Sequence, residues 1–188
     1  MMNRRQMLAL GAAAVSPLAI SAQPTPGKPA GELVITQTSC ELMLLSSLKG
    51  KVVVLEILLT TCPHCQACAS TMQKVYTEMN GAFQPVGAAI DPNNMTEARM
   101  KIPQFIYSNG LKFPVGWTNR DMAYQWLGAN PNVAAVYFPQ LIIIDKQGVI
   151  REYHPATEEA YFKDEANNLR KSVERYLGPT PGKAAPKR

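Results

Sequence analysis

Two cysteines separated by two residues are the part of this sequence best suited to chemistry. Cys62 and Cys65 enclose Pro63 and His64, and they stand where an apolar run gives way to a helical pattern. A helix N-terminus presents unpaired backbone N–H groups and a partial positive charge, which favours a thiolate at the first cysteine. Cys62 is therefore the expected nucleophile. The spacing predicts that Cys65 lies one turn deeper on the same face, where it can resolve a mixed disulfide.

The two enclosed residues are expected to tune this pair. Pro63 stiffens the first helical turn, where its missing N–H group costs nothing. His64 adds a donor that can stabilise the Cys62 thiolate further. Because a more stable thiolate makes the corresponding disulfide more oxidising, His64 is expected to take part in catalysis.

Other interpretations of the cysteines stay open at this point. The pair could form an inert disulfide, and a zinc knuckle would need a second pair of ligands, for which only Cys40 and His154 remain. Cys68 extends the series to three cysteines, as in an iron–sulfur run, but Met72 stands where the fourth cysteine is required. We therefore expect no metal and no cofactor. Cys68 is predicted to be a small core residue, His154 a surface residue, and Cys40 either free or paired.

Strands and helices that alternate along the chain must position the pair. The apolar run from Lys51 to Leu59 predicts a central strand buried on both faces, and only Glu56 interrupts it. Apolar residues then repeat at helical spacing over residues 62–80, up to Gly81. Further strands are expected over 83–90, 141–145 and 149–153, and further helices over 96–109, 119–127 and 157–177. This order predicts an α/β fold with a mixed central sheet flanked by helices.

The first 22 residues have the pattern of an export signal. Arg4 and Arg5 precede an apolar stretch that is short for a membrane span, and small residues follow up to Ala22. The arginine pair is similar to a twin-arginine signal. We expect cleavage near Ala22, a periplasmic or otherwise exported protein, and no stable membrane span after cleavage.

Composition indicates one ordinary domain between two loosely ordered ends. The chain has 188 residues, of which 46% are hydrophobic, and the net charge is +5. That charge lies in the leader and the tail, so the middle of the chain is neutral and offers no nucleic-acid face. A linker rich in Pro and Gly is expected over 23–32, a domain over 33–177 and a flexible tail over 178–188. A monomer is expected.

The stretch from Leu55 to Cys65 resembles the active-site strand and helix start of thioredoxin-fold oxidoreductases. The tetrapeptide CPHC is typical of DsbA-like oxidases, whereas residues 45–54, 113–115 and 138–148 are more similar to the TlpA/ResA-like branch. The likeness covers about Leu33 to Leu177. It implies a thioredoxin fold, protein thiols or disulfides as substrates, and an upstream redox partner.

The resemblance also implies roles for three further residues. Glu56 matches the acid that this fold buries below the disulfide, with a raised pKa suited to proton exchange with Cys65. Pro139 matches the cis-proline beside the disulfide, and Phe138 the residue whose backbone pairs with an extended substrate. The sequence departs from the family at Thr61, where a Trp is frequent, and it is too short for the helical insertion of DsbA-like enzymes.

The function expected from these features is exchange of a Cys62–Cys65 disulfide or dithiol with exported proteins, in the manner of a TlpA-like reductase. A DsbA-like oxidase is the main alternative. A peroxiredoxin would carry the signature PxxxTxxC, but Leu55 and Leu59 stand at its proline and threonine positions. A Sco-like copper metallochaperone uses cysteines three residues apart and a distant His, so the spacing of two found here would need help from His154 or Cys68.

Overall fold

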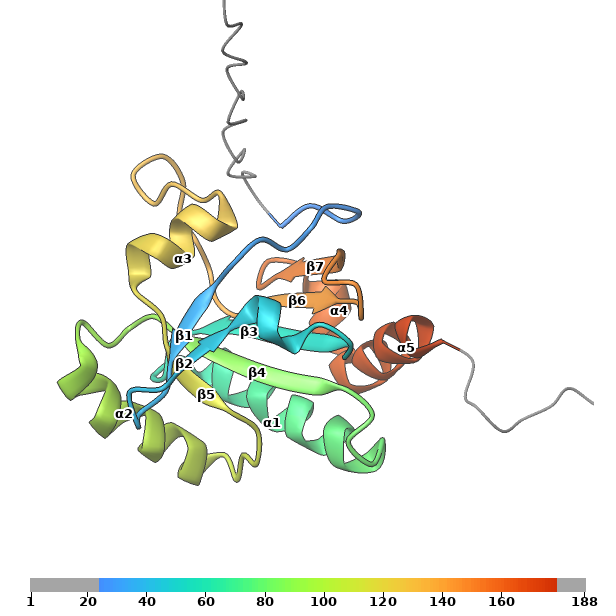
Figure 1. Ribbon diagram of the computed structural model, residues 1–188, viewed down its shortest axis with the longest axis horizontal. Coiled ribbons are helices and arrows are strands. Elements are labelled where there is room, and N and C mark those ends of the chain that lie inside the picture. The colour runs from blue at the N-terminus through green and yellow to red at the C-terminus, as the bar shows by residue number, and fades with distance from the viewer. Residues whose placement is uncertain (1–23, 179–188) are drawn as a thin grey trace, which may run out of the picture.

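The computed structural model of the chain describes residues 24–178, so the predicted export signal and residues 179–188 of the predicted tail lie outside the described part. A seven-stranded mixed sheet has the strand order β2-β1-β5-β4-β3-β6-β7 (Figure 1). The strands are β1 (Val34–Thr36), β2 (Leu42–Leu44), β3 (Val53–Leu58), β4 (Gln84–Ala89), β5 (Val115–Trp117), β6 (Gln140–Ile144) and β7 (Ile150–Pro155). The helices are a 3-10 turn η1 (Leu45–Leu48), α1 (Pro63–Glu78), α2 (Met95–Ser108), α3 (Arg120–Leu127), α4 (Glu159–Lys163) and α5 (Glu165–Leu177).

Strand β3 lies inside the sheet and leads directly to the cysteine pair. It pairs in parallel with β4 and antiparallel with β6, and all six of its residues are buried. Branched apolar side chains suit a strand that is covered on both faces, which is why the run at residues 51–59 predicts its position well. The mixed α/β sheet with flanking helices and the thioredoxin fold are confirmed.

Helix α1 begins at the cysteine pair and packs its apolar side against the domain. Pro63 is its first residue and Cys62 its N-cap, because proline fits a position that needs no N–H donor. The buried residues of α1 repeat at helical spacing; they are Cys65, Cys68, Ala69, Met72 and Val75. The helix contacts β4 on one side and α5 on another (Figure 1). Within residues 24–178, no helix is long and apolar enough to cross a membrane.

Two parts of the sequence-based prediction differ from the structure. The sheet gains β1, β2 and β5, which have three residues each and are too short to show a period. The single helix expected over residues 157–177 is two helices, because the backbone at Asp164 leaves the helical region with φ −130° and ψ 47°. Glu165 therefore opens a separate helix, α5.

The described part of the segment expected to be a linker is held against the sheet. The amide of Gly27 donates to the carbonyl of Ile150 over 2.7 Å, and the amide of Ile150 donates to the carbonyl of Lys28 over 2.9 Å. Ala30 donates in the same way to Gly148, the glycine of the turn that joins β6 and β7, which has the positive φ expected there. Residues 24–32 thus run beside the start of β7.

His154 is not the surface residue that the sequence predicts. It lies within β7, and its side chain is only 12% exposed because the ring of Tyr161 stacks on it at a centroid distance of 3.6 Å. Its Nε2 lies 3.1 Å from a carboxylate oxygen of Glu152, and its Nδ1 lies 2.8 Å from Glu158. The helix α4, which the sequence did not separate from α5, provides this cover.

We expect Glu152→Gln to destabilise the fold by roughly 2 kcal/mol at pH 7. Burial by itself would raise the pKa of Glu152, but hydrogen bonds from His154, Ser172 and Tyr176 lower it to about 2. The lowered pKa stabilises the folded state above the ordinary pKa of a glutamate, and this stabilisation is lost as the pH falls through 2. Urea unfolding should therefore show a smaller difference in the free energy of unfolding between wild type and Glu152→Gln at pH 3 than at pH 7. The exposed Glu174 on α5 is the control, and Glu174→Gln should change little.

Candidate active site

Cys62 lies at the surface end of the site, against a loop that is remote in sequence. As the N-cap of α1 it has extended backbone angles and is half-buried. Its Sγ lies 3.7 Å from the carbonyl oxygen of Phe138, and the peptide bond between Phe138 and Pro139 is cis. The structure therefore brings together three of the predicted site residues, and the expected cis-proline is present.

Cys65 lies one turn further along α1 and is fully buried. Burial raises the pKa of its thiol far above the usual value, and the neighbouring charge of Glu56 raises it further. The side chain hydrogen-bonds with Cys62, and both cysteines are free thiols in this structure. This arrangement matches the expected pairing of a reachable first thiol with a deeper second thiol.

Glu56 is fully buried in the middle of β3 and interacts with both cysteines. Neither of its carboxyl oxygens has a hydrogen-bond partner of standard geometry. Burial raises the pKa of Glu56 well above the ordinary value, and the charge of Glu165 raises it again, while a weak hydrogen bond with the Cys68 thiol lowers it. Glu56 is buried as predicted, and its catalytic role stays a prediction.

The ring of His64 is packed against α4. It meets Phe162 edge to face, with ring centroids 4.7 Å apart and an interplanar angle of 78°. Among the contacts of residues 24–178, the His64 ring makes no hydrogen bond with Cys62. Its expected assistance to the Cys62 thiolate therefore stays a prediction.

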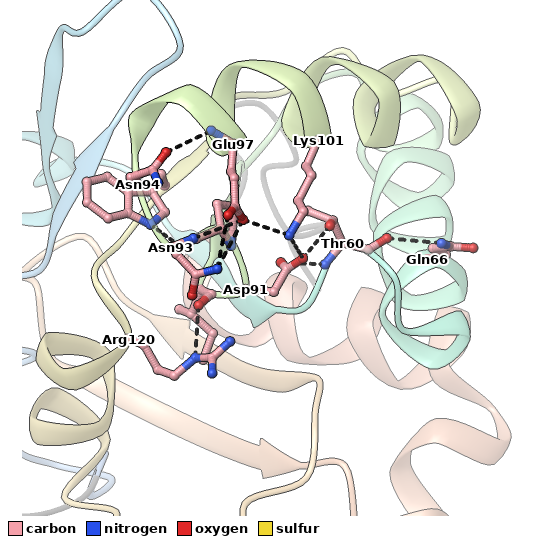
Figure 2. A network of polar contacts seen from close by, with 11 residues as sticks. Thr60, Gln66, Asp91, Asn93, Asn94, Glu97, Lys101 and Arg120 are labelled. Atoms are coloured by element: carbon pink, nitrogen blue, oxygen red, sulfur yellow. Dashed lines mark hydrogen bonds and ion pairs between the residues drawn. The ribbon is translucent and has the colours of Figure 1, made fainter.

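Asp91, which the sequence analysis did not single out, fixes the turn between β3 and α1 (Figure 2). Its Oδ1 accepts a hydrogen bond of 2.8 Å from the amide of Thr60, and its Oδ2 accepts one of 2.6 Å from the Thr60 hydroxyl. The side chain of Gln66 on α1 donates to the carbonyl of Thr60 over 3.0 Å. Three hydrogen bonds thus hold the residue that stands two positions before Cys62.

The sequence did contain a signal for Asp91. The residue follows the predicted strand 83–90 directly, and β4 runs parallel to β3. Polar residues just after neighbouring parallel strands meet at the same edge of the sheet, where sites commonly form. Figure 2 shows that Lys101 of α2 reaches the same place: its Nζ lies 3.8 Å from Asp91 and 3.0 Å from Glu97.

A half-buried cysteine at a helix start, a buried partner cysteine and a neighbouring cis-proline match a thioredoxin-fold thiol:disulfide oxidoreductase, and the comparisons with known proteins agree with this class. The profile of the AhpC/TSA family matches residues 26–153, and the chain belongs to that family.

Relatives and solved structures that are similar to this chain are named as disulfide or thiol-disulfide oxidoreductases. The thiol-disulfide oxidoreductase ResA of Bacillus thuringiensis (strain Al Hakam) is 28% identical over 126 residues, which are 67% of each chain. The thioredoxin domain of a thiol-disulfide oxidoreductase from Bacteroides vulgatus superimposes with a TM-score of 0.62 at 17% identity, covering 82% of this chain and 99% of that one. A secreted Mycobacterium tuberculosis disulfide oxidoreductase, described as homologous to E. coli DsbE, gives a TM-score of 0.56 at 19% identity, covering 76% and 94%. The protein is an enzyme of thiol:disulfide exchange.

We expect Asp91→Ala to loosen the turn before Cys62. The amide of Thr60 would lose its acceptor in a place where Thr60 is only 7% exposed, which should lower the free energy of unfolding by roughly 2 kcal/mol. Thr60→Val removes only the hydroxyl bond and keeps the amide bond, so its effect should be smaller. Urea unfolding and hydrogen exchange of the Thr60 amide would measure both variants. Equal effects of the two substitutions would contradict the role assigned to the amide bond.

Proposed function

We propose that this protein is an exported reductase of protein disulfides that works through Cys62 and Cys65. One observation carries the proposal: the buried Cys65 thiol interacts both with the half-buried Cys62 and with the fully buried Glu56. Such an arrangement can bind a substrate at the half-buried Cys62 thiol and transfer a proton at the buried Glu56 carboxyl group.

The reaction follows from this order of groups. The Cys62 thiolate attacks a substrate disulfide, so that a mixed disulfide forms and one substrate thiolate leaves. Cys65 then gives its proton to the Glu56 carboxylate and attacks Sγ of Cys62. The Cys62–Cys65 disulfide forms, and the second substrate thiolate leaves and is protonated. Two electrons pass from the enzyme to the substrate, and an upstream dithiol partner returns them by the reverse exchange.

Phe138 and Pro139 are proposed to receive the substrate backbone. The carbonyl of Phe138 lies beside Cys62 Sγ at 3.7 Å, so a peptide that pairs with this loop would bring its own sulfur to the nucleophile. The cis-proline occupies the same edge of the site. This assignment rests on the family resemblance together with the observed contact.

The packing of His64 supports reduction over oxidation. A strongly oxidising pair owes its potential to a stabilised reduced form, in which a thiolate is favoured. The ring of His64, the residue expected to favour oxidation, is packed against Phe162.

Two other activities have less support. Leu55 and Leu59 occupy the positions where a peroxiredoxin signature has proline and threonine, and Leu55 is fully buried in β3. His154, the residue that would have to assist in copper binding, is held between Glu152 and Glu158 in β7. The proposed export rests on the signal pattern of residues 1–22 and agrees with the description of one structural relative as secreted.

The reduction potential of the Cys62–Cys65 pair is the direct test. We expect the purified mature protein, equilibrated in dithiothreitol and glutathione buffers, to give a reduction potential of about −270 mV, as thioredoxin does. A value near about −120 mV would identify an oxidant of the DsbA type instead. Cys65→Ser is the control and should abolish the titration. If the unsubstituted pair does not cycle at all, a redox role for it is wrong.

Glu56→Gln should separate catalysis from stability. We expect the exchange reaction to slow by roughly tenfold to hundredfold, because the residue that accepts the Cys65 proton is gone. Since the pKa of Glu56 is raised in the folded state, the wild type loses stability as the pH rises above the ordinary glutamate value, and the variant does not. Thermal unfolding should therefore show that the stability of the variant increases relative to that of the wild type from pH 5 to pH 8. An unchanged exchange rate would contradict the proposed role of Glu56.

A further inference from the structure

A second buried acid lies close to Glu56. Glu165 is the first residue of α5 and is only 9% exposed, at the place where α5 packs against α1. Its side chain hydrogen-bonds with Cys68 and with Thr71, which are both on α1. Its Oε1 has no nitrogen or oxygen partner. The reaction described above does not use this carboxyl group.

Cys68 connects the two acids. It is fully buried, one helical turn after Cys65 on the same face of α1. Its thiol interacts with Glu56 from β3 and with Glu165 from α5. The sequence-based prediction of a small core residue is right about burial, but it missed that the thiol bridges two carboxyl groups.

The cluster extends from the sealed centre of the site toward the surface. Cys65, Glu56 and Cys68 are each 0% exposed, so a proton that leaves Cys65 has no direct access to water. Glu165 keeps a small exposed fraction, and its partner Thr71 is half-buried. Glu165 is therefore the acid of this cluster that lies nearer to solvent, since Glu56 has no exposed surface.

The electrostatic surroundings allow Glu165 to exchange a proton. Burial raises its pKa, while the hydrogen bonds from Cys68 and Thr71 lower it. The positive end of the α5 dipole also favours its ionised form. The other titratable groups that interact with it are Glu56 on β3, whose pKa the Glu165 charge raises, and the Tyr161 phenol on α4.

We propose that Cys68 and Glu165 form a proton relay that connects Glu56 with solvent. The inference deepens the proposed function, because it rests on the proposed roles of Cys65 and Glu56. After Glu56 takes the Cys65 proton, it passes a proton to the Cys68 sulfur while the Cys68 thiol gives its own proton to the Glu165 carboxylate. Glu165 then releases a proton to water, where the departing substrate thiolate takes one up. Cys68 ends the cycle as a thiol and is neither oxidised nor reduced.

Single-turnover reduction of an aromatic disulfide such as Ellman's reagent separates the two chemical steps. The first aromatic thiolate reports the attack by Cys62, and the second reports the attack by Cys65. The measurement is made on the full mature chain with Cys40→Ser, so that this exposed cysteine does not react. We expect Glu165→Gln and Cys68→Ala to slow the second release by about tenfold and to leave the first unchanged. Cys68→Ser should restore the second release to within about twofold of the parent, because a hydroxyl group also donates and accepts a proton.

A double variant and a control distinguish a relay from a packing effect. Cys68→Ala combined with Glu165→Gln should be no slower than either substitution alone, because both interrupt the same path. Glu174→Gln, at an exposed position of α5, should leave both releases unchanged. Thermal unfolding of every variant checks that the fold persists at the assay temperature.

The outcomes separate this inference from the proposed function. If the parent protein releases the first thiolate but not the second, the proposed roles of Cys65 and Glu56 fail. If the parent releases both and the Cys68 and Glu165 variants match it, only the relay is overturned. Equal slowing by Cys68→Ser and Cys68→Ala, or multiplied effects in the double variant, would likewise overturn the relay and leave the redox pair intact.

Discussion

The turn from β3 into α1 is the constraint on which the rest of the site depends. It places Cys62 at a helix N-terminus and buries Cys65, whose thiol interacts with Glu56. The turn is held from the next strand, since both oxygens of Asp91 accept hydrogen bonds from Thr60. Because β3 and β4 are parallel neighbours, this support does not need a long loop. A shift of either strand would move the nucleophile and the proton acceptor together.

An acid in the middle of a buried strand is costly unless its charge is neutralised or used. Neither carboxyl oxygen of Glu56 has a hydrogen-bond partner of standard geometry, and burial raises the pKa of this group well above the ordinary value. A second acid, Glu165, lies across Cys68 from it. Strongly shifted acids beside a reactive pair are typical of functional sites and add little to stability. The cluster is therefore best understood through the movement of protons.

Regular elements with a clear period were predictable, and the contacts between remote segments were not. The patterns at residues 51–59 and 62–80 predict β3 and α1. In a strand covered on both faces every residue is buried, whereas in a helix the buried residues recur every three to four positions. The break at Asp164 has no such signal, and it creates α4. That short helix covers His154 and packs on His64, which explains why His154 is less exposed than the sequence predicts.

The sequence by itself determined the redox pair, the strand that carries Glu56 and, through the family resemblance, the thioredoxin fold and Pro139. These depend on residue types and spacings that are local in the chain. Only the tertiary structure decided which distant groups meet them: the Phe138 carbonyl at Cys62, 76 residues away, and Asp91 at Thr60, 31 residues away. Glu165 reaches Cys68 in the same manner. Such contacts follow from strand order and helix packing, which depend on the burial of the whole apolar core and leave no local pattern in the sequence.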